Sequence, residues 1–109
     1  QAIKESGKNT VMLGVDSDLA VADPSVASVL LTSITKHVDN AVRDTVIAAA
    51  AGKYDPTPYV GTLANGGVGL ADFHDFTSKL PAGLTDELAK LQSEIIAGTL
   101  TVTSPSSPK

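Results

Sequence analysis

The chain has 109 residues, a formal net charge of -4 and no cysteine. This length suits one ordinary domain, and the lack of cysteine excludes disulfides, thiol chemistry and cysteine-ligated zinc. Its 8 basic residues are scattered and are outnumbered by 12 acidic ones. This argues against nucleic acid as a partner, because such binding rests on clustered Lys and Arg. No apolar run approaches the roughly 20 residues of a membrane-spanning helix.

The first nine residues have the pattern of a helix that is ending, because Gly7 follows a short helix-forming run and glycine commonly terminates helices. The sequence shows neither an initiating methionine nor a signal peptide. We therefore expect a fragment of a longer protein, whose upstream residues and any targeting signal are absent from this sequence.

An apolar run at 10–15 contains two β-branched valines and predicts a buried strand. The run ends in Asp-Ser-Asp at 16–18. Ligands of open α/β sheets bind beyond the carboxyl ends of strands, so Asp16 would present a hydrogen-bond acceptor at that edge. Asp-Ser-Asp is also typical of an ordinary turn, since these side chains bond their own backbone. Taken alone, the stretch favours the turn.

A loop with one turn is expected at 19–28, where Pro24 disfavours helix at the residue before it. A second apolar strand is predicted at 29–34, and the clearest helix of the chain at 35–51. Its apolar residues share one side at helical spacing: Val38, Val42, Val46 and Ala49.

The ends of this helix carry residues suited to capping. Ser33 or Thr35 can cap its start, and Gly52 stands where a left-handed residue would end it. A strand followed by a helix is half of a βαβ unit, which favours a parallel sheet.

The middle of the chain predicts an edge hairpin. A connector with two prolines at 54–58 leads to a short strand at 59–63. Asn-Gly-Gly at 65–67 is a strong reversal signal, and 68–71 would return as the second strand. An ordered loop is expected at 72–76.

The C-terminal part predicts one more helix at 84–97, because Leu84, Leu88, Leu91 and Ile95 recur at helical spacing. A short strand is possible at 99–103. The composition of 104–109, rich in serine and proline, predicts a disordered tail.

Four landmarks occur in one order: GVDSD at 14–18, VLLTSITKHVDNAV at 29–42, GGVGLA at 66–71, and a helix closing in IIAGT at 95–99. Together they resemble the C-terminal part of the basic membrane protein (BMP) family, also called the purine-nucleoside receptor family. Its members are substrate-binding lipoproteins of bacterial ABC importers. The resemblance covers nearly the whole chain except the tail, and the combination is specific although each piece alone is weak.

The resemblance implies a type I periplasmic-binding-protein fold, in which two α/β lobes close on a ligand at their hinge. Residues 1–103 would be part of the C-terminal lobe, a parallel sheet flanked by helices with an edge hairpin. The N-terminal lobe and the first strands of this lobe would lie outside the chain. The full-length protein would be a lipid-anchored, extracytoplasmic protein that delivers a nucleoside to the permease of an ABC importer.

Two candidate ligand contacts follow from the resemblance, carried over residue by residue. Asp16 matches a ribose-binding acid, and Lys36 matches a ribose-binding lysine at the start of the helix after the second strand. A carboxylate acceptor and an ammonium donor can together recognise two hydroxyls. The alternative is a structural Asp16–Lys36 ion pair at the strand ends; with the family pattern, ligand contact is favoured for both.

Two departures from the family pattern bear on the identity of the ligand more than on the fold. Leu19 stands where family members commonly have glutamine, in a somewhat longer loop. Asn65 stands where many members carry an acidic residue before GGVG.

The other polar residues predict structural roles. Asp18 is expected to be a turn or cap residue and Ser33 a helix cap. His37 is interpreted as a solvated helix residue and His74 as a hydrogen-bonded loop residue, since neither has partners that would make a metal site. The glycines at 66–69 lack the Lys-Ser/Thr of a phosphate loop, so turn and close-packing roles are expected.

No nucleophile–base–acid set is present, so we expect no catalytic residues, no cofactor and no metal. The leading hypothesis is a fragment of a nucleoside-binding ABC-importer receptor, acting by binding and hinge closure. The alternative is a cytosolic regulatory or sensor protein of the same fold, which an upstream signal peptide with a lipobox cysteine would exclude. An enzyme on a doubly wound sheet would need catalytic residues upstream. An incomplete sheet would also expose an edge, so the fragment is expected to oligomerise unless it was trimmed from a larger protein.

Overall fold

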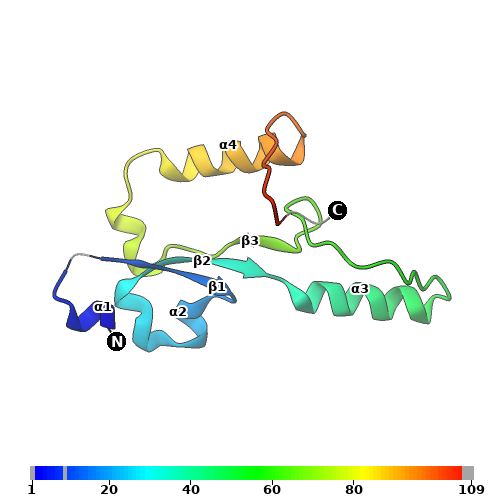
Figure 1. Cartoon of the computed structure of the whole chain (residues 1–109), viewed down its shortest axis with the longest axis horizontal. Coiled ribbons are helices and arrows are strands. Elements are labelled where there is room, and N and C mark those ends of the chain that lie inside the picture. The colour runs from blue at the N-terminus through cyan, green and yellow to red at the C-terminus, as the bar shows by residue number, and fades with distance from the viewer. Residues whose placement is uncertain (1, 9, 107–109) are drawn as a thin grey trace.

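The computed structural model describes residues 2–8 and 10–106. Four α-helices and three strands lie in this part of the chain, with two 3-10 helices between them (Figure 1). In chain order these elements are α1 (Ala2–Glu5), β1 (Met12–Asp16), α2 (Leu19–Ala22), η1 (Pro24–Val29), β2 (Leu30–Lys36), α3 (Val38–Ala50), β3 (Val68–Leu70), η2 (His74–Lys79) and α4 (Leu84–Ile96). This is a mixed α/β fold with a small sheet flanked by helices.

The three strands form one sheet in the order β1-β2-β3. β1 and β2 are parallel, as the sequence predicts, and Asp16 lies opposite Thr35. β3 is antiparallel to β2, with Val68 opposite Lys36. Because β1 and β2 run the same way, their carboxyl ends, and with them Asp16 and Lys36, reach the same edge of the sheet.

The crossover from β1 to β2 is packed tightly around Ser33, which is fully buried. Its Oγ accepts a hydrogen bond of 3.1 Å from the backbone N–H of Leu19 at the start of α2. A Cβ on Gly14 would lie 2.3 Å from this Oγ, so only glycine fits there. The prediction that Ser33 caps the next helix is therefore wrong: the residue is inside β2 and holds α2 against the sheet.

The segment 19–28, predicted as a loop with one turn, contains α2 and most of η1. Asp18 caps α2 by accepting from the N–H of Ala20 at 3.1 Å, which confirms its cap role. Asp23 accepts from the N–H of Ser25 in the same way and starts η1. Short polar caps thus permit helical turns on both sides of Pro24.

The helix predicted at 35–51 is confirmed as α3, but it begins at Val38. Thr35 and Lys36 instead extend β2, because both are paired with neighbouring strands. The N-cap is His37, which makes no side-chain capping bond, so Thr35 does not cap either. The predicted end is correct: Gly52 has φ +68°, and the N–H of Lys53 bonds the carbonyl of Ala48 at 2.8 Å, as in a Schellman motif.

The predicted edge hairpin is wrong in one arm. Residues 59–63 form no strand, and Val68–Leu70 pairs with β2 instead. The prolines at 56 and 58 lie just before this segment and, lacking an N–H, prevent a regular ladder from extending back through 56–58. The side chain of Asn65 then bonds the backbone of 60–67 and folds the loop onto itself.

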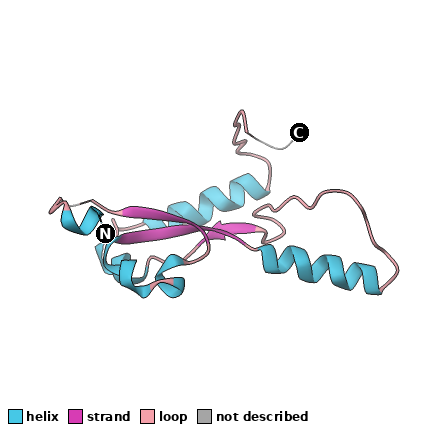
Figure 2. Cartoon of the chain, turned by 60° about the horizontal axis from the view of Figure 1, so that its bottom comes forward, coloured by secondary structure: helices cyan, strands magenta, loops and turns pink. Residues whose placement is uncertain are grey.

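The buried core of the described residues is small and lies in the middle strand. Its side chains, each less than 8% exposed, are Leu30, Thr32, Ser33 and Thr35. Elsewhere large apolar side chains face outward, including Leu13, Val15, Ile34 and Leu70 on the sheet. α3 projects beyond the sheet along the direction of β2 (Figures 1 and 2). The predicted apolar stripe of α3 is therefore exposed, with Val38, Val42 and Val46 each at least 58% accessible.

The C-terminal helix is confirmed as α4, which ends at Ile96 before Gly98 with φ +73°. Residues 99–103 form no strand. The predicted tail at 104–109 is described only to 106, and 107–109 lie outside the described residues. Among the residues described, no helix has the length and apolar character needed to cross a membrane.

Candidate functional site

The two sequence-predicted ligand contacts lie together at the carboxyl edge of the parallel strands. Asp16 is the last residue of β1, and Lys36 is the last residue of β2, not the first of the helix. The Nζ of Lys36 is 2.8 Å from Oδ1 of Asp16, and their side chains are 56% and 72% exposed. The ion pair is thus present, and both charges remain open to solvent.

The energetics of this pair do not favour a purely structural role. An exposed ion pair contributes roughly 0.2–1 kcal/mol to stability. Asp16, however, has φ +82°, a backbone conformation that costs a non-glycine residue about 1–3 kcal/mol, although Asp tolerates it better than most. The ion pair therefore does not offset the strain. Backbone strain of this kind clusters at binding and active sites, which makes Asp16 a candidate ligand contact on structural grounds.

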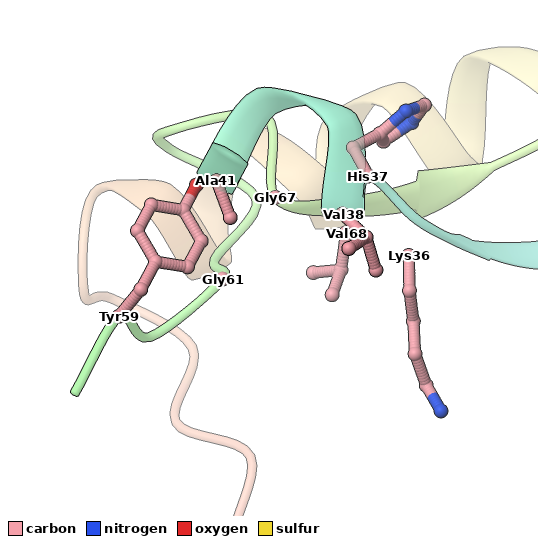
Figure 3. Close-up of a pocket in the computed structure, with 8 residues that line it drawn as sticks. All are labelled: Lys36, His37, Val38, Ala41, Tyr59, Gly61, Gly67 and Val68. Carbon is pink, nitrogen blue, oxygen red and sulfur yellow. The ribbon is translucent and has the colours of Figure 1, made fainter. Parts of the chain in front are cut away.

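A hollow of about 200 Å³ opens beside Lys36, between the start of α3 and the loop before β3 (Figure 3). It is lined by Lys36, His37, Val38, Ala41, Tyr59, Gly61, Gly67 and Val68. Figure 3 shows Tyr59 at one end, beside Ala41, and Lys36 at the other, with its side chain extended away from the ring. The hollow thus combines an aromatic and aliphatic wall with a single cation at its rim.

The sequence predictions did not place Tyr59 or the glycines of this loop in a site. Tyr59 was assigned to a strand, where alternation would decide which face it occupies. The nearest signal is Asn-Gly-Gly at 65–67, which reverses the chain a few residues after Tyr59; the pairing of Val68 with Lys36 then brings this turn beside β2. A turn signal alone does not show on which side of the turn a hollow forms.

Asp18 and His74 form a second polar pair near the start of α2. His74 Nε2 lies 2.8 Å from Asp18 Oδ2, and both side chains are less than a third exposed. The prediction that His74 is hydrogen-bonded is confirmed, but the residue begins η2 and does not lie in a loop, so the loop expected at 72–76 is wrong from His74 onward. Asp18 thus both caps α2 and ties η2 to it. His37 contacts Thr35, with His37 Nε2 3.2 Å from Thr35 Oγ1, at the N-terminus of α3.

Two carboxylates away from this edge are held in their charged form by local hydrogen bonds. The pKa of Asp23 is lowered by hydrogen bonds from the side chain and then the backbone N–H of Ser25. The pKa of Asp55 is lowered first by the backbone N–H of Thr57 and then by its side chain. A carboxyl group that stays ionised in a turn suits a capping role and not that of a general acid.

Metal binding finds no support among the residues that the structure describes. No group of three or more His, Asp or Glu side chains there could hold a metal ion. The charged pair at the carboxyl edge is one acid and one amine, a pair that fits hydroxyl recognition better than metal coordination.

No protein-family model and no curated protein sequence matches the chain. Among solved structures, the chain is similar to one described as ABC transporter system solute-binding proteins from Aeropyrum pernix K1, with a TM-score of 0.66 and 20% identity. The match covers 97% of this chain and 36% of that chain, so the present chain spans about a third of that protein's length. At this level of identity the similarity establishes the fold: the chain folds like part of a solute-binding protein.

Proposed function

We propose that the chain is part of the substrate-binding protein of an ABC importer and contributes one wall of a nucleoside site. The observation that carries this proposal is the placement of Asp16, with φ +82°, 2.8 Å from Lys36 at the carboxyl edge of two parallel strands. The fold shared with a solute-binding protein supports it. So does the resemblance of the GVDSD and TKHVDNAV stretches to the purine-nucleoside receptor family.

The chemistry proposed for this wall is recognition without reaction. The Asp16 carboxylate accepts hydrogen bonds from the ribose hydroxyls, and the Lys36 ammonium donates to a hydroxyl oxygen. In the absence of ligand the two charges satisfy each other, so binding replaces one exposed ion pair with hydrogen bonds to the diol. Because an exposed ion pair is worth little, this exchange is favourable once closure of a second lobe excludes water.

The remaining parts of the proposal concern the whole protein. We propose a second lobe that provides the opposite wall, a permease that receives the ligand, and a lipid anchor that keeps the protein outside the cytoplasm. Residues 1–103 would then be part of the C-terminal lobe, and 104–109 a tail that is not needed for binding. Because one wall holds only half of the contacts, this chain by itself should bind nucleosides weakly or not at all.

Calorimetry of the intact protein with adenosine, guanosine and inosine tests the proposal. We expect at least one of them to bind, and Asp16→Ala to weaken that binding about 10- to 100-fold, since hydrogen bonds to a charged group are worth about 1.5–3 kcal/mol. Asp44→Ala is the matched control, because Asp44 is also an exposed acid in an ion pair, 3.1 Å from Arg43, but lies on α3 away from the edge. The proposal fails if no nucleoside binds, or if the two variants behave alike.

A further inference from the structure

The loop at 59–67 is closed by the side chain of Asn65 together with a short backbone turn, in which the carbonyl of Thr62 accepts from the N–H groups of Gly67 at 3.0 Å and Val68 at 3.4 Å. Oδ1 of Asn65 accepts hydrogen bonds from the N–H of Thr62 at 2.8 Å and of Gly67 at 2.9 Å. Its Nδ2 donates to the carbonyl of Val60 at 2.9 Å. In return, Thr62 Oγ1 accepts from the N–H of Asn65 at 3.2 Å. Two donors meet the oxygen and one acceptor meets the nitrogen, so only this orientation of the amide satisfies its neighbours.

These bonds bring two glycines into backbone contact. A Cβ built on Gly67 would lie 2.4 Å from the Cα of Gly61 and 2.9 Å from Oδ1 of Asn65. No side chain fits between the backbone segments at Gly61 and Gly67, and Gly67 is buried as a result. Both glycines also line the hollow beside Lys36, so the closed loop shapes one wall of it.

The closed loop is joined to the residues around Lys36 by two hydrogen bonds. The carbonyl of Gly67 accepts from the N–H of His37 at 2.9 Å. The carbonyl of Gly66 accepts from Nδ2 of Asn40 at 3.1 Å. Val68, the residue after Gly67, pairs with Lys36 itself. The backbone positions of Lys36 and of His37 therefore both depend on where Gly67 lies.

We propose that Asn65 is a positioning residue for the ligand-binding edge: by closing the loop it fixes Gly67 and, through Gly67, the backbone that carries Lys36. The part of this proposal that concerns ligand affinity rests on the proposed function above. Asn65 is itself exposed and does not touch Lys36, so its effect passes through the loop.

The physical reason is pre-organisation. Without the Asn65 side chain, the N–H of Thr62 and the carbonyl of Val60 turn to water. The backbone bonds from Gly67 and Val68 to the carbonyl of Thr62 then have to hold an exposed loop with three glycines on their own. Lys36 is then correctly placed for only a fraction of the time, and the apparent affinity falls by that fraction. Two or three hydrogen bonds are lost and partly replaced by bonds to water, so a three- to tenfold loss of affinity is the expected order.

Amide hydrogen exchange resolved to single residues, in the intact protein without ligand, tests the loop part. Asn65→Ala should accelerate exchange at Thr62, whose N–H loses its acceptor, and at His37, whose acceptor Gly67 moves. Asn65→Asp keeps a side-chain acceptor for both N–H groups and should preserve most of the protection at Thr62. Asp55→Ala is the matched control. It removes a similar 2.9 Å side-chain bond, to the N–H of Thr57, from the segment just before the loop, and it should leave exchange at His37 unchanged.

Unchanged exchange at His37 in Asn65→Ala would overturn the proposal, because opening the loop would then not alter the backbone at the binding edge. If Asn65→Ala does not fold, the comparison rests on Asn65→Asp. This variant loses the donation to Val60 and should accelerate exchange at His37 to a smaller extent, or the proposal is wrong.

Nucleoside affinity in the intact protein tests the positioning part. Asn65→Ala should bind three- to tenfold more weakly than the parent, Asn65→Asp should lie between them, and Asp55→Ala should match the parent. Equal affinity for the parent and Asn65→Ala would overturn the positioning role. If the parent binds no nucleoside, the proposed function fails instead, and the exchange measurement still decides whether Asn65 controls the backbone at His37.

Discussion

At the scale of single residues, the carboxyl edge of the sheet depends on two positions in β1 with special backbone or packing requirements. Asp16 has a positive φ, which a glycine would adopt more easily, and Gly14, two residues earlier, is where a side chain is excluded. The exclusion is caused by Ser33, which lies opposite Gly14 on β2, and by Leu19 in the crossover. The backbone that presents Asp16 is thus set by contacts on the buried side of the strand.

Substitution of Gly14 tests this packing. Gly14→Ala should reduce the free energy of unfolding by about 1–3 kcal/mol, as expected for overpacking, because the added methyl would lie 2.3 Å from Ser33 Oγ and 2.8 Å from Leu19 Cδ1. Gly69→Ala is the control in the same sheet, since its Cβ would make an ordinary 3.4 Å contact with Thr35 Oγ1. Urea unfolding of both variants measures the difference; equal stabilities would contradict the packing role of Gly14.

The sequence predicts Asp16 at the end of a strand because the end of an apolar run can be read locally, whereas Lys36 is a candidate through the family resemblance, which places it at the start of a helix. The sequence did not predict that Ser33 binds Leu19 or that Asn65 closes a loop, since Ser and Asn serve equally well as helix caps and turn residues. Which of these roles they take depends on partners that only the register of β2 brings near. The ion pair between Asp16 and Lys36 was an open alternative for the same reason.

At the scale of elements, α3 shows how an amphipathic pattern can be correct and yet lack a partner. Its periodicity and its terminal Gly52 are local properties, and both agree with the structure. The valines of its stripe remain exposed, although an amphipathic helix of a globular protein normally buries such a face. In a protein three times as long, such as the structural neighbour, further elements are available to cover it.

A charged substitution in this stripe tests whether the face needs a cover. Val42→Lys should leave the helix content of this chain unchanged by circular dichroism and reduce its self-association by light scattering, because Val42 is 58% exposed here. In the intact protein the same change should lower stability by about 1–3 kcal/mol, if the face is buried there. Asp44→Lys, on the opposite side of the helix, should reduce neither the self-association of this chain nor the stability of the intact protein. Equal stability of the two variants in the intact protein would argue that α3 is solvated there as well.

At the scale of the whole molecule, the chain is more extended than a domain of its size. Its radius of gyration is 17.1 Å and its longest dimension 55 Å, whereas a compact domain of 100 residues has a radius of gyration of about 13 Å. α3 accounts for much of the length in Figure 1. Among the strands that the structure describes, β1 is at the edge of the sheet, a position that favours pairing with another strand.

We therefore expect this chain, when isolated, to associate through its sheet edge and apolar faces. Small-angle scattering should give a particle mass above that of one chain at high concentration, and exchange at β1 should slow as concentration rises. A monodisperse monomer with protected β1 amides would contradict the expectation and would show that the sheet is complete without further strands.

The sequence alone determined the parallel pair of strands, both long helices and the position of Asp16 at the end of the first strand. These features rest on periodicity, capping and chain order, which act over a few residues. Only the tertiary structure decided that β3 joins β2, that Ser33 anchors the crossover, and that Asn65 closes the loop beside Lys36. Each of these depends on contacts between segments distant in the chain, and such contacts form and contribute to stability only once the strands are in register.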